Sequence, residues 1–195
     1  MKISPPVPKE MIEGCKAGNP SDFEALVEQY QKKVYNIAYR ILGNQEEAKD
    51  LAQEVFITLL ESIHGLRDEA KFEPWLTQIT LNHCRNRWKY LKRRQYFKTD
   101  SIDDPVETED GTVPKAFCHS DDPAFLYEKK MINEMVQNGL LTLPEDQREL
   151  IVLRDLQGLS YEEMESILGI PMGTIKSRLH RSRMELKEIL KKWKQ

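Results

Sequence analysis

The chain has 195 residues, of which 31% are charged and 39% hydrophobic. With only 9 glycines and 10 prolines, this composition excludes collagen-like, low-complexity and fully disordered chains, because it supplies enough apolar surface for a core. The formal net charge of −3, averaged over the whole chain, does not indicate a nucleic-acid binder.

Cysteine usage and hydropathy indicate the compartment. The three cysteines lie far apart and form no CxxC pair, so neither a disulfide framework nor a zinc ribbon is predicted. No stretch approaches the roughly 20 apolar residues of a membrane span, and residues 1–15 lack the apolar core of a signal peptide. We therefore expect a soluble, cytoplasmic protein.

Helical periodicity dominates the first half of the chain. Ser21 to Glu24 has the pattern of a capping box, and apolar residues then recur at helical spacing until Gly43, before a second cap at Asn44. Pro74 suits the first turn of a further helix. Three helices are thus expected, at about 21–41, 45–63 and 75–94.

An acidic segment follows these helices. Residues 98–123 carry eight acids, two lysines and three prolines without any period, which predicts an extended linker. Helical segments resume at about 124–138, 145–157, 160–168 and 172–192. The expected fold is all-α, with an N-terminal extension at 1–19, a helical domain at 20–97, the acidic flexible linker at 98–123 and a second helical domain at 124–195.

The second domain contains the pattern of a helix-turn-helix. Ser160 and Glu163 form a capping box, the short helix ends at Gly169, and a longer basic helix begins near Met172. On a helical wheel the basic helix has one apolar face, expected to pack inward from Ile175 to Trp193, and one polar face that could reach base edges and phosphates. The alternative is a solvated basic helix in a generic bundle.

A basic block lies at the end of the first domain. Residues 83–98 carry seven lysines and arginines and no acid, with aromatic residues interleaved, which is typical of a surface that binds an unpaired strand. Trp88 falls on the outward face, where it either contacts a base or packs on a neighbouring loop. Phe72, in the preceding polar loop, fits either a core anchor or an exposed base contact.

Several motifs together resemble a known family. Residues 50–56 (DLAQEVF) resemble the DLxQEVF segment of bacterial RNA polymerase sigma factors, and residues 75–82 (WLTQITLN) are similar to their WLxxIxxN helix. Residues 143–183 resemble their C-terminal region. The resemblance covers about 20–95 and 125–192. With only the second and fourth conserved regions, it points to the extracytoplasmic-function (ECF) subgroup, with 20–97 as region 2 and 124–195 as region 4.

The resemblance implies partners and site residues. Core RNA polymerase would be bound through its largest-subunit clamp coiled coil and its flap, with Asp50, Gln53 and Glu54 as contacts. The minus-ten element of promoter DNA would be recognised and melted by Phe72, Asn82, Arg85, Asn86, Trp88 and Lys89. The minus-thirty-five element would be read by Thr174, Lys176, Ser177, Arg178, His180 and Arg181. The acidic linker would pass through the RNA exit channel; its composition also fits a plain solvated tether.

The expected function is therefore promoter-directed transcription initiation without catalysis, cofactor or metal. An anti-sigma factor is a further partner that the resemblance suggests. One alternative is a freestanding helix-turn-helix repressor or activator whose first domain senses a ligand or dimerises. Another is a helical hydrolase using His83–Cys84 or Cys118–His119, which is disfavoured because adjacent helical residues point about 100° apart and no third partner lies at useful spacing.

Overall fold

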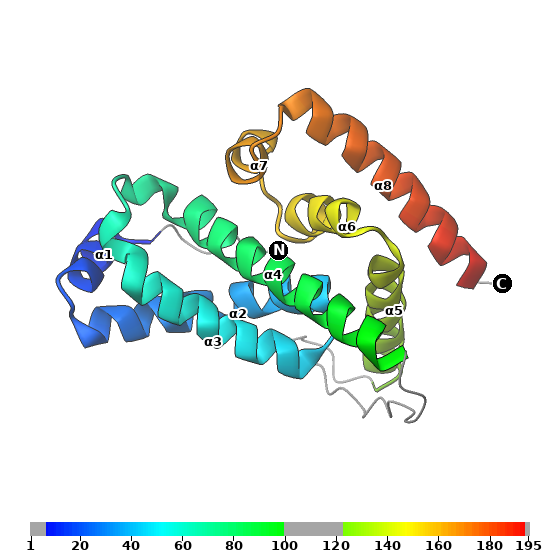
Figure 1. Ribbon diagram of the computed structural model, residues 1–195, viewed down its shortest axis with the longest axis horizontal. Helices are drawn as coiled ribbons and strands as arrows, with labels where there is room; N and C mark the ends of the chain where they lie inside the picture. The colour runs from blue at the N-terminus through cyan, green and yellow to red at the C-terminus, as the bar shows by residue number, and fades with distance from the viewer. Residues whose placement is uncertain (1–6, 100–122, 194–195) are drawn as a thin grey trace.

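The computed structural model describes residues 7–99 and 123–193 (Figure 1). These residues form helices and no strand, as the sequence predicts. The predicted linker falls almost wholly outside the described residues, as do Cys118 and His119. The elements are α1 (Lys9–Lys16), α2 (Pro20–Leu42), α3 (Gln45–Ser62), η1 (Ile63–Gly65), η2 (Glu69–Lys71), α4 (Phe72–Thr99), α5 (Pro123–Thr142), α6 (Glu145–Ile151), η3 (Val152–Leu156), α7 (Tyr161–Leu168) and α8 (Met172–Trp193).

The N-terminal half is a bundle in which α2, α3 and α4 lie side by side, with α1 across the start of α2 (Figure 1). Its core is mainly aliphatic and includes Leu26, Ile37, Leu51, Leu59 and Leu81, all at most 1% exposed. Each helix contributes one apolar face, so burial of these faces stabilises the bundle.

Local caps determine where these helices begin. The capping box predicted at Ser21 is wrong, because the Asn19 side chain accepts the Ser21 amide at 3.1 Å and Pro20 occupies the first helical position. The predicted cap at Asn44 is confirmed, since its side chain accepts the Glu47 amide at 3.0 Å. Gly43 ends α2 with a φ of 79°, a conformation that glycine adopts without strain.

The C-terminal half contains the predicted helix-turn-helix. The capping box at Ser160 is confirmed, with both reciprocal hydrogen bonds to Glu163 present, and Gly169 ends α7 in the left-handed conformation. Helix α8 buries Ile175, Leu179 and Ser182. The expectation that its inward face extends to Trp193 is wrong, because that side chain is 45% exposed where α8 runs past the end of the domain (Figure 1).

One buried arginine contributes to the contact between the two halves. Arg148 of α6 is 1% exposed and donates hydrogen bonds to the carbonyls of Leu140, Leu141 and Leu143 at the end of α5. It also donates to the Ile41 carbonyl at the end of α2. The guanidinium thus satisfies carbonyls that helix ends leave unpaired and joins both halves of the chain. Within the described ranges, no helix is both long and apolar enough to cross a membrane.

Candidate nucleic-acid and polymerase interfaces

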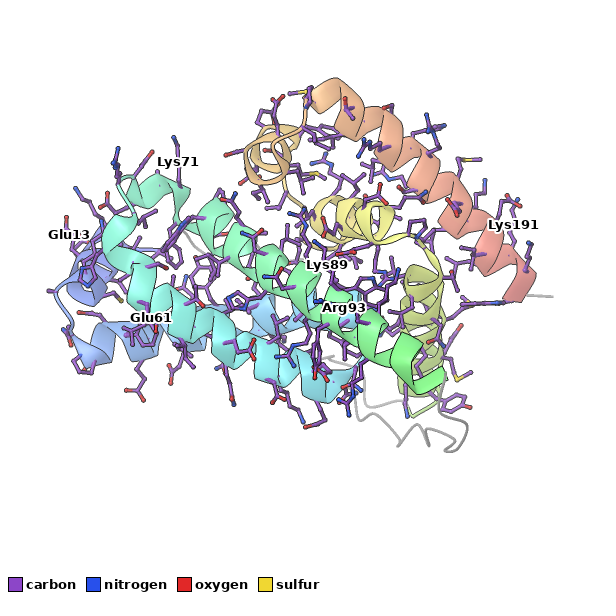
Figure 2. The ribbon with its side chains drawn as sticks, viewed as in Figure 1. Glu13, Glu61, Lys71, Lys89, Arg93 and Lys191 are labelled. Atoms are coloured by element: carbon purple, nitrogen blue, oxygen red, sulfur yellow. The ribbon has the colours of Figure 1, made fainter. Side chains whose placement is uncertain are left out.

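Helix α4 carries the basic block predicted to bind an unpaired strand. Asn82, Asn86 and Lys89 are exposed along it, and Figure 2 shows Lys89 and Arg93 on this helix. Arg85 is engaged instead: its Nε and one terminal nitrogen donate to the two carboxylate oxygens of Glu149 of α6, at 2.8 and 2.6 Å. These charge-assisted hydrogen bonds raise the pKa of Arg85 above its usual value.

Trp88 is covered by the second half of the chain. The guanidinium carbon of Arg148 lies 4.3 Å from its ring centroid, and the Lys92 ammonium lies 5.4 Å from it. The indole Nε1 is buried and has no hydrogen-bond partner among the described residues. Of the alternatives for Trp88, the structure thus shows packing, although on helix α6 rather than on a loop.

Phe72 lies in the core. It is 1% exposed and meets the ring of Tyr30 edge-on, with the centroids 5.3 Å apart. A side chain so buried reaches a base only by leaving the core, so of the two roles that the sequence left open the structure supports the core anchor. In this conformation Phe72 cannot make the direct base contact that the family resemblance implied.

A pocket of about 340 Å³ lies beside the loop that joins α3 to α4. Arg67, Asp68 and Lys71 of the loop line it together with Trp75 at the start of α4, and Ile167 of α7 contributes from the other half of the chain. No sequence pattern predicts this pocket, because its walls come from segments about 90 residues apart.

The polar face of α8 lies on the protein surface. Lys176, Ser177, Arg178, His180 and Arg181 are exposed, and Thr174 is half-buried. On the helical wheel Thr174, Ser177, His180 and Arg181 lie opposite the buried face of the same helix, and Lys176 and Arg178 flank it. Two of the cations have contacts with other helices: the Lys176 ammonium lies 5.2 Å from the Tyr161 ring centroid, and an Arg178 nitrogen lies 4.0 Å from an Asp146 carboxylate oxygen.

The outer face of α3 combines charge with exposed apolar residues. Asp50, Gln53 and Glu54 are exposed, and Glu54 accepts a hydrogen bond from Arg87 of α4 at 2.5 Å. Ile57 is 58% exposed and Leu60 is 47% exposed on the same helix. Both residues follow Gln53 at helical spacing, and this signal could have identified them.

Comparison with protein families decides what these surfaces belong to. Residues 26–94 match Sigma-70 region 2 and residues 133–186 match Sigma-70 region 4. The ECF RNA polymerase sigma factor SigW of Bacillus subtilis is 33% identical over 94% of this chain and 96% of its own length. The chain belongs to the ECF sigma factors. Such proteins are transcription initiation factors rather than enzymes.

Other relatives and solved structures agree with this family. The ECF sigma factor SigE of Mycolicibacterium smegmatis is 35% identical over 92% of this chain, which spans 65% of that relative's length. In fold, the chain resembles the sigma factor RpoE of Bartonella quintana, solved with the anti-sigma factor NepR, at a TM-score of 0.67 and 24% identity over 88% of this chain and 98% of that one. CnrH, solved with the cytosolic domain of CnrY, gives 0.64 at 21% over 93% and 96%.

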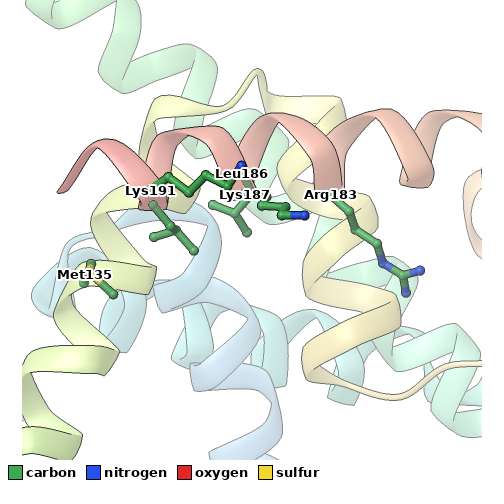
Figure 3. Close-up of a pocket in the computed structure, with 6 residues that line it drawn as sticks. Met135, Arg183, Leu186, Lys187 and Lys191 are labelled. Carbon is green, nitrogen blue, oxygen red and sulfur yellow. The ribbon is translucent and has the colours of Figure 1, made fainter. Parts of the chain in front are cut away.

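An apolar groove separates α5 and α8 in this ECF sigma factor (Figure 3). Met135, Leu186 and Leu190 line it, and the cationic side chains of Arg183, Lys187 and Lys191 surround them. Gly139 allows the two helices to approach closely, because a Cβ at this position would lie 3.0 Å from both leucines. The volume of the groove is about 380 Å³.

The pair proposed for a hydrolase has the environment of a structural site. Cys84 is fully buried, and burial raises the pKa of its thiol. The reactive thiolate form is therefore disfavoured. His83 Nε2 lies 3.0 Å from the Thr58 hydroxyl. In the described part of the chain, no group of three His, Cys, Asp or Glu side chains is placed to hold a metal ion. Family membership sets aside both this alternative and the freestanding regulator.

Proposed function

We propose that this ECF sigma factor binds core RNA polymerase through the outer face of α3 and reads promoter DNA with α4 and α8. In this proposal residues 20–97 serve as region 2 and residues 124–195 as region 4. The observation that carries it is the surface of α8, where five side chains from Lys176 to Arg181 are exposed while Ile175 and Leu179 of the same helix are buried. Such a helix can enter a major groove with its core face still packed.

The two DNA-binding surfaces would act on different forms of DNA. Lys176, Arg178, His180 and Arg181 would contact duplex at the minus-thirty-five element. Asn82, Asn86 and Lys89 on α4 would follow the strand that is exposed at the minus-ten element. Unstacking duplex DNA costs about 1.4 kcal/mol per step, so captured bases must offset that cost. The loop pocket beside Trp75 offers a place for an unstacked base.

Arg85 and Trp88 would take part only after the two halves separate. One guanidinium cannot hold Glu149 and a phosphate at once, and Trp88 is covered by Arg148. On this basis we assign Arg85 and Trp88 to the minus-ten surface of the open protein. Phe72 is assigned to the core that supports this surface.

The partners follow from the same proposal. Gln53, Glu54 and the apolar Ile57 and Leu60 would meet the clamp coiled coil of core polymerase, with Asp50 beside them. The groove between α5 and α8 would meet the flap. The cytoplasm, where polymerase works, is the proposed location, and an anti-sigma factor is a further proposed partner.

Transcription by a reconstituted holoenzyme tests the function. Purified protein and core polymerase should start transcription at discrete sites on a fragmented genomic DNA library, and core polymerase alone should not. Sequencing the 5′ ends of the transcripts would identify two elements upstream of each start site. Absence of specific starts across the library would contradict the proposal, as would tight binding to a palindromic duplex without core polymerase.

A further inference from the structure

Helix α1 lies outside the part of the chain that matches region 2, yet it belongs to the same core. Its Ile12 is fully buried and its Cys15 is 2% exposed, both within the cluster formed by α2, α3 and α4. Gly14 faces the first turn of α2 so closely that a Cβ there would lie 1.9 Å from a carboxylate oxygen of Asp22. Helix α1 is therefore held firmly against the start of α2.

The last residue of α1 reaches the loop between α3 and α4. Lys16 Nζ donates to Glu69 Oε1 at 2.8 Å, and the two side chains are only 24% and 25% exposed. Glu69 opens η2, the short turn that carries Lys71 into the pocket wall. This hydrogen bond lowers the pKa of Glu69, which favours its carboxylate form. Both charges also suit their helix ends, with the cation in a last turn and the acid in a first turn.

A second contact fixes the other end of the loop. Glu73, in the first turn of α4, accepts hydrogen bonds from the Tyr30 hydroxyl at 3.0 Å and from Lys33 Nζ at 2.5 Å. Phe72 beside it is buried against Tyr30. Helix α2 therefore holds the loop where it enters α4, whereas Lys16 of α1 holds it in the middle.

Between these two anchors lie the side chains that face the pocket. Arg67 and Lys71 are exposed, and they line the pocket that the proposed function assigns to an unstacked base. If only Glu73 anchored the loop, the rest of the loop could move, and the positions of Arg67 and Lys71 would shift with it. The Lys16–Glu69 pair removes that freedom at η2.

We propose that α1 is part of the promoter-reading unit, with Lys16 and Glu69 as positioning residues that fix the α3–α4 loop for base selection at the minus-ten element. The proposal rests on the proposed function. The two residues act through Arg67 and Lys71 and need not touch DNA themselves. An ion pair this close to the surface contributes little to overall stability, so its loss should change base selection more than folding.

Charge reversal within the holoenzyme tests this inference. Lys16→Glu, Glu69→Lys and the double exchange would each be combined with core polymerase and a promoter library randomised over the minus-ten element. Each single reversal should lower the discrimination between preferred and disfavoured bases by about threefold or more, the size expected when a partly exposed pair is lost. The double exchange should restore at least half of that discrimination, although its charges suit the helix ends less well.

Matched measurements separate positioning from folding. Glu13→Lys makes the same charge change on an exposed position of α1, where Glu13 pairs with Lys9, and should leave base selection unchanged. Thermal unfolding of each variant shows whether the fold is retained. Unchanged selection in both single variants would overturn the proposal, and so would a loss that the double exchange does not repair. Failure of the unmodified protein to start transcription would instead contradict the proposed function.

Discussion

Arg85 of α4 and Glu149 of α6 form a bidentate ion pair that joins the two halves of the protein. The carboxylate side chain is 5% exposed and the guanidinium side chain 35% exposed. Arg85 is also one of the residues assigned to promoter DNA. A carboxylate with two oxygens presents the same charge and the same acceptors as a phosphate, so Glu149 occupies the arginine in the way that DNA would.

Replacing Glu149 by Gln should therefore release Arg85 for DNA. Because Arg85 is partly exposed and can be rehydrated, we expect the loss of the pair to weaken the contact between the halves by about 1 kcal/mol. Binding of a fluorescent single-stranded minus-ten oligonucleotide to the isolated chain should tighten about fivefold, the equivalent of that energy. Fluorescence anisotropy measures this affinity.

Asp146→Asn is the matched control for Glu149→Gln. Asp146 lies on the same helix, its side chain is 66% exposed, and its nearest cation is Arg178 at 4.0 Å. Its replacement should leave the affinity for the single strand unchanged. Equal effects of the two variants would mean that net charge, rather than release of Arg85, governs binding.

Arg148→Lys should destabilise the whole chain. The guanidinium donates to four carbonyls at the ends of α5 and α2, and a lysine ammonium has only three donors and no planar fork. Arg148 is only 1% exposed, and this burial lowers its pKa. Unsatisfied buried carbonyls cost about 1–3 kcal/mol, so the melting temperature should fall by about 5–10 °C.

Arg181→Lys is the matched control for the calorimetry of Arg148→Lys. Arg181 is exposed on α8, so the same chemical change there should leave the melting temperature within about 1 °C. A similar melting temperature for Arg148→Lys would show that the carbonyls find water or other partners, and that Arg148 does not join the two halves.

Local patterns predicted the helices well and their contacts poorly. The caps at Asn44 and Ser160 were correct because each is made by residues three positions apart. The start of α2 was misplaced because Ser21 and Asn19 are both good caps, and only the geometry shows which one is used. Helix α1 was not predicted, since its eight residues give too few apolar positions for a helical period.

Contacts between distant residues could not be predicted from periodicity. Arg85 and Glu149 are 64 positions apart, and each looks like an ordinary surface charge in its own helix. No sequence pattern marks Arg148 as buried, because its hydrogen-bond partners are backbone carbonyls at helix ends. The face of α8 was predictable because a single helix both buries Ile175 and presents Arg181.

Ile57→Ala combined with Leu60→Ala should weaken binding to core polymerase. Both side chains are about half exposed, so the isolated fold loses little when they are shortened. Burying the exposed part of each against the polymerase would contribute about 1 kcal/mol, so the loss of both should weaken binding about thirtyfold in a titration with labelled core enzyme. Met184→Ala, a 46% exposed position on α8, is the control that should bind normally. Normal binding by the double variant would remove α3 from the interface.

Arg181→Ala should impair recognition of duplex DNA without impairing capture of the open strand. Arg181 is exposed on the polar face of α8, far along the chain from the α4 surface, and the loss of one base or phosphate contact costs about 1–3 kcal/mol. Holoenzyme carrying this variant should bind a minus-thirty-five duplex about tenfold more weakly or worse, whereas binding to a promoter already unpaired at the minus-ten element and lacking the upstream element should be unchanged. Lys192→Ala near the end of the same helix is the matched control, since Lys192 is exposed but lies beyond the predicted reading face. An equal loss on both templates would mean that α8 contributes to strand opening, and the division of roles between α4 and α8 would then be wrong.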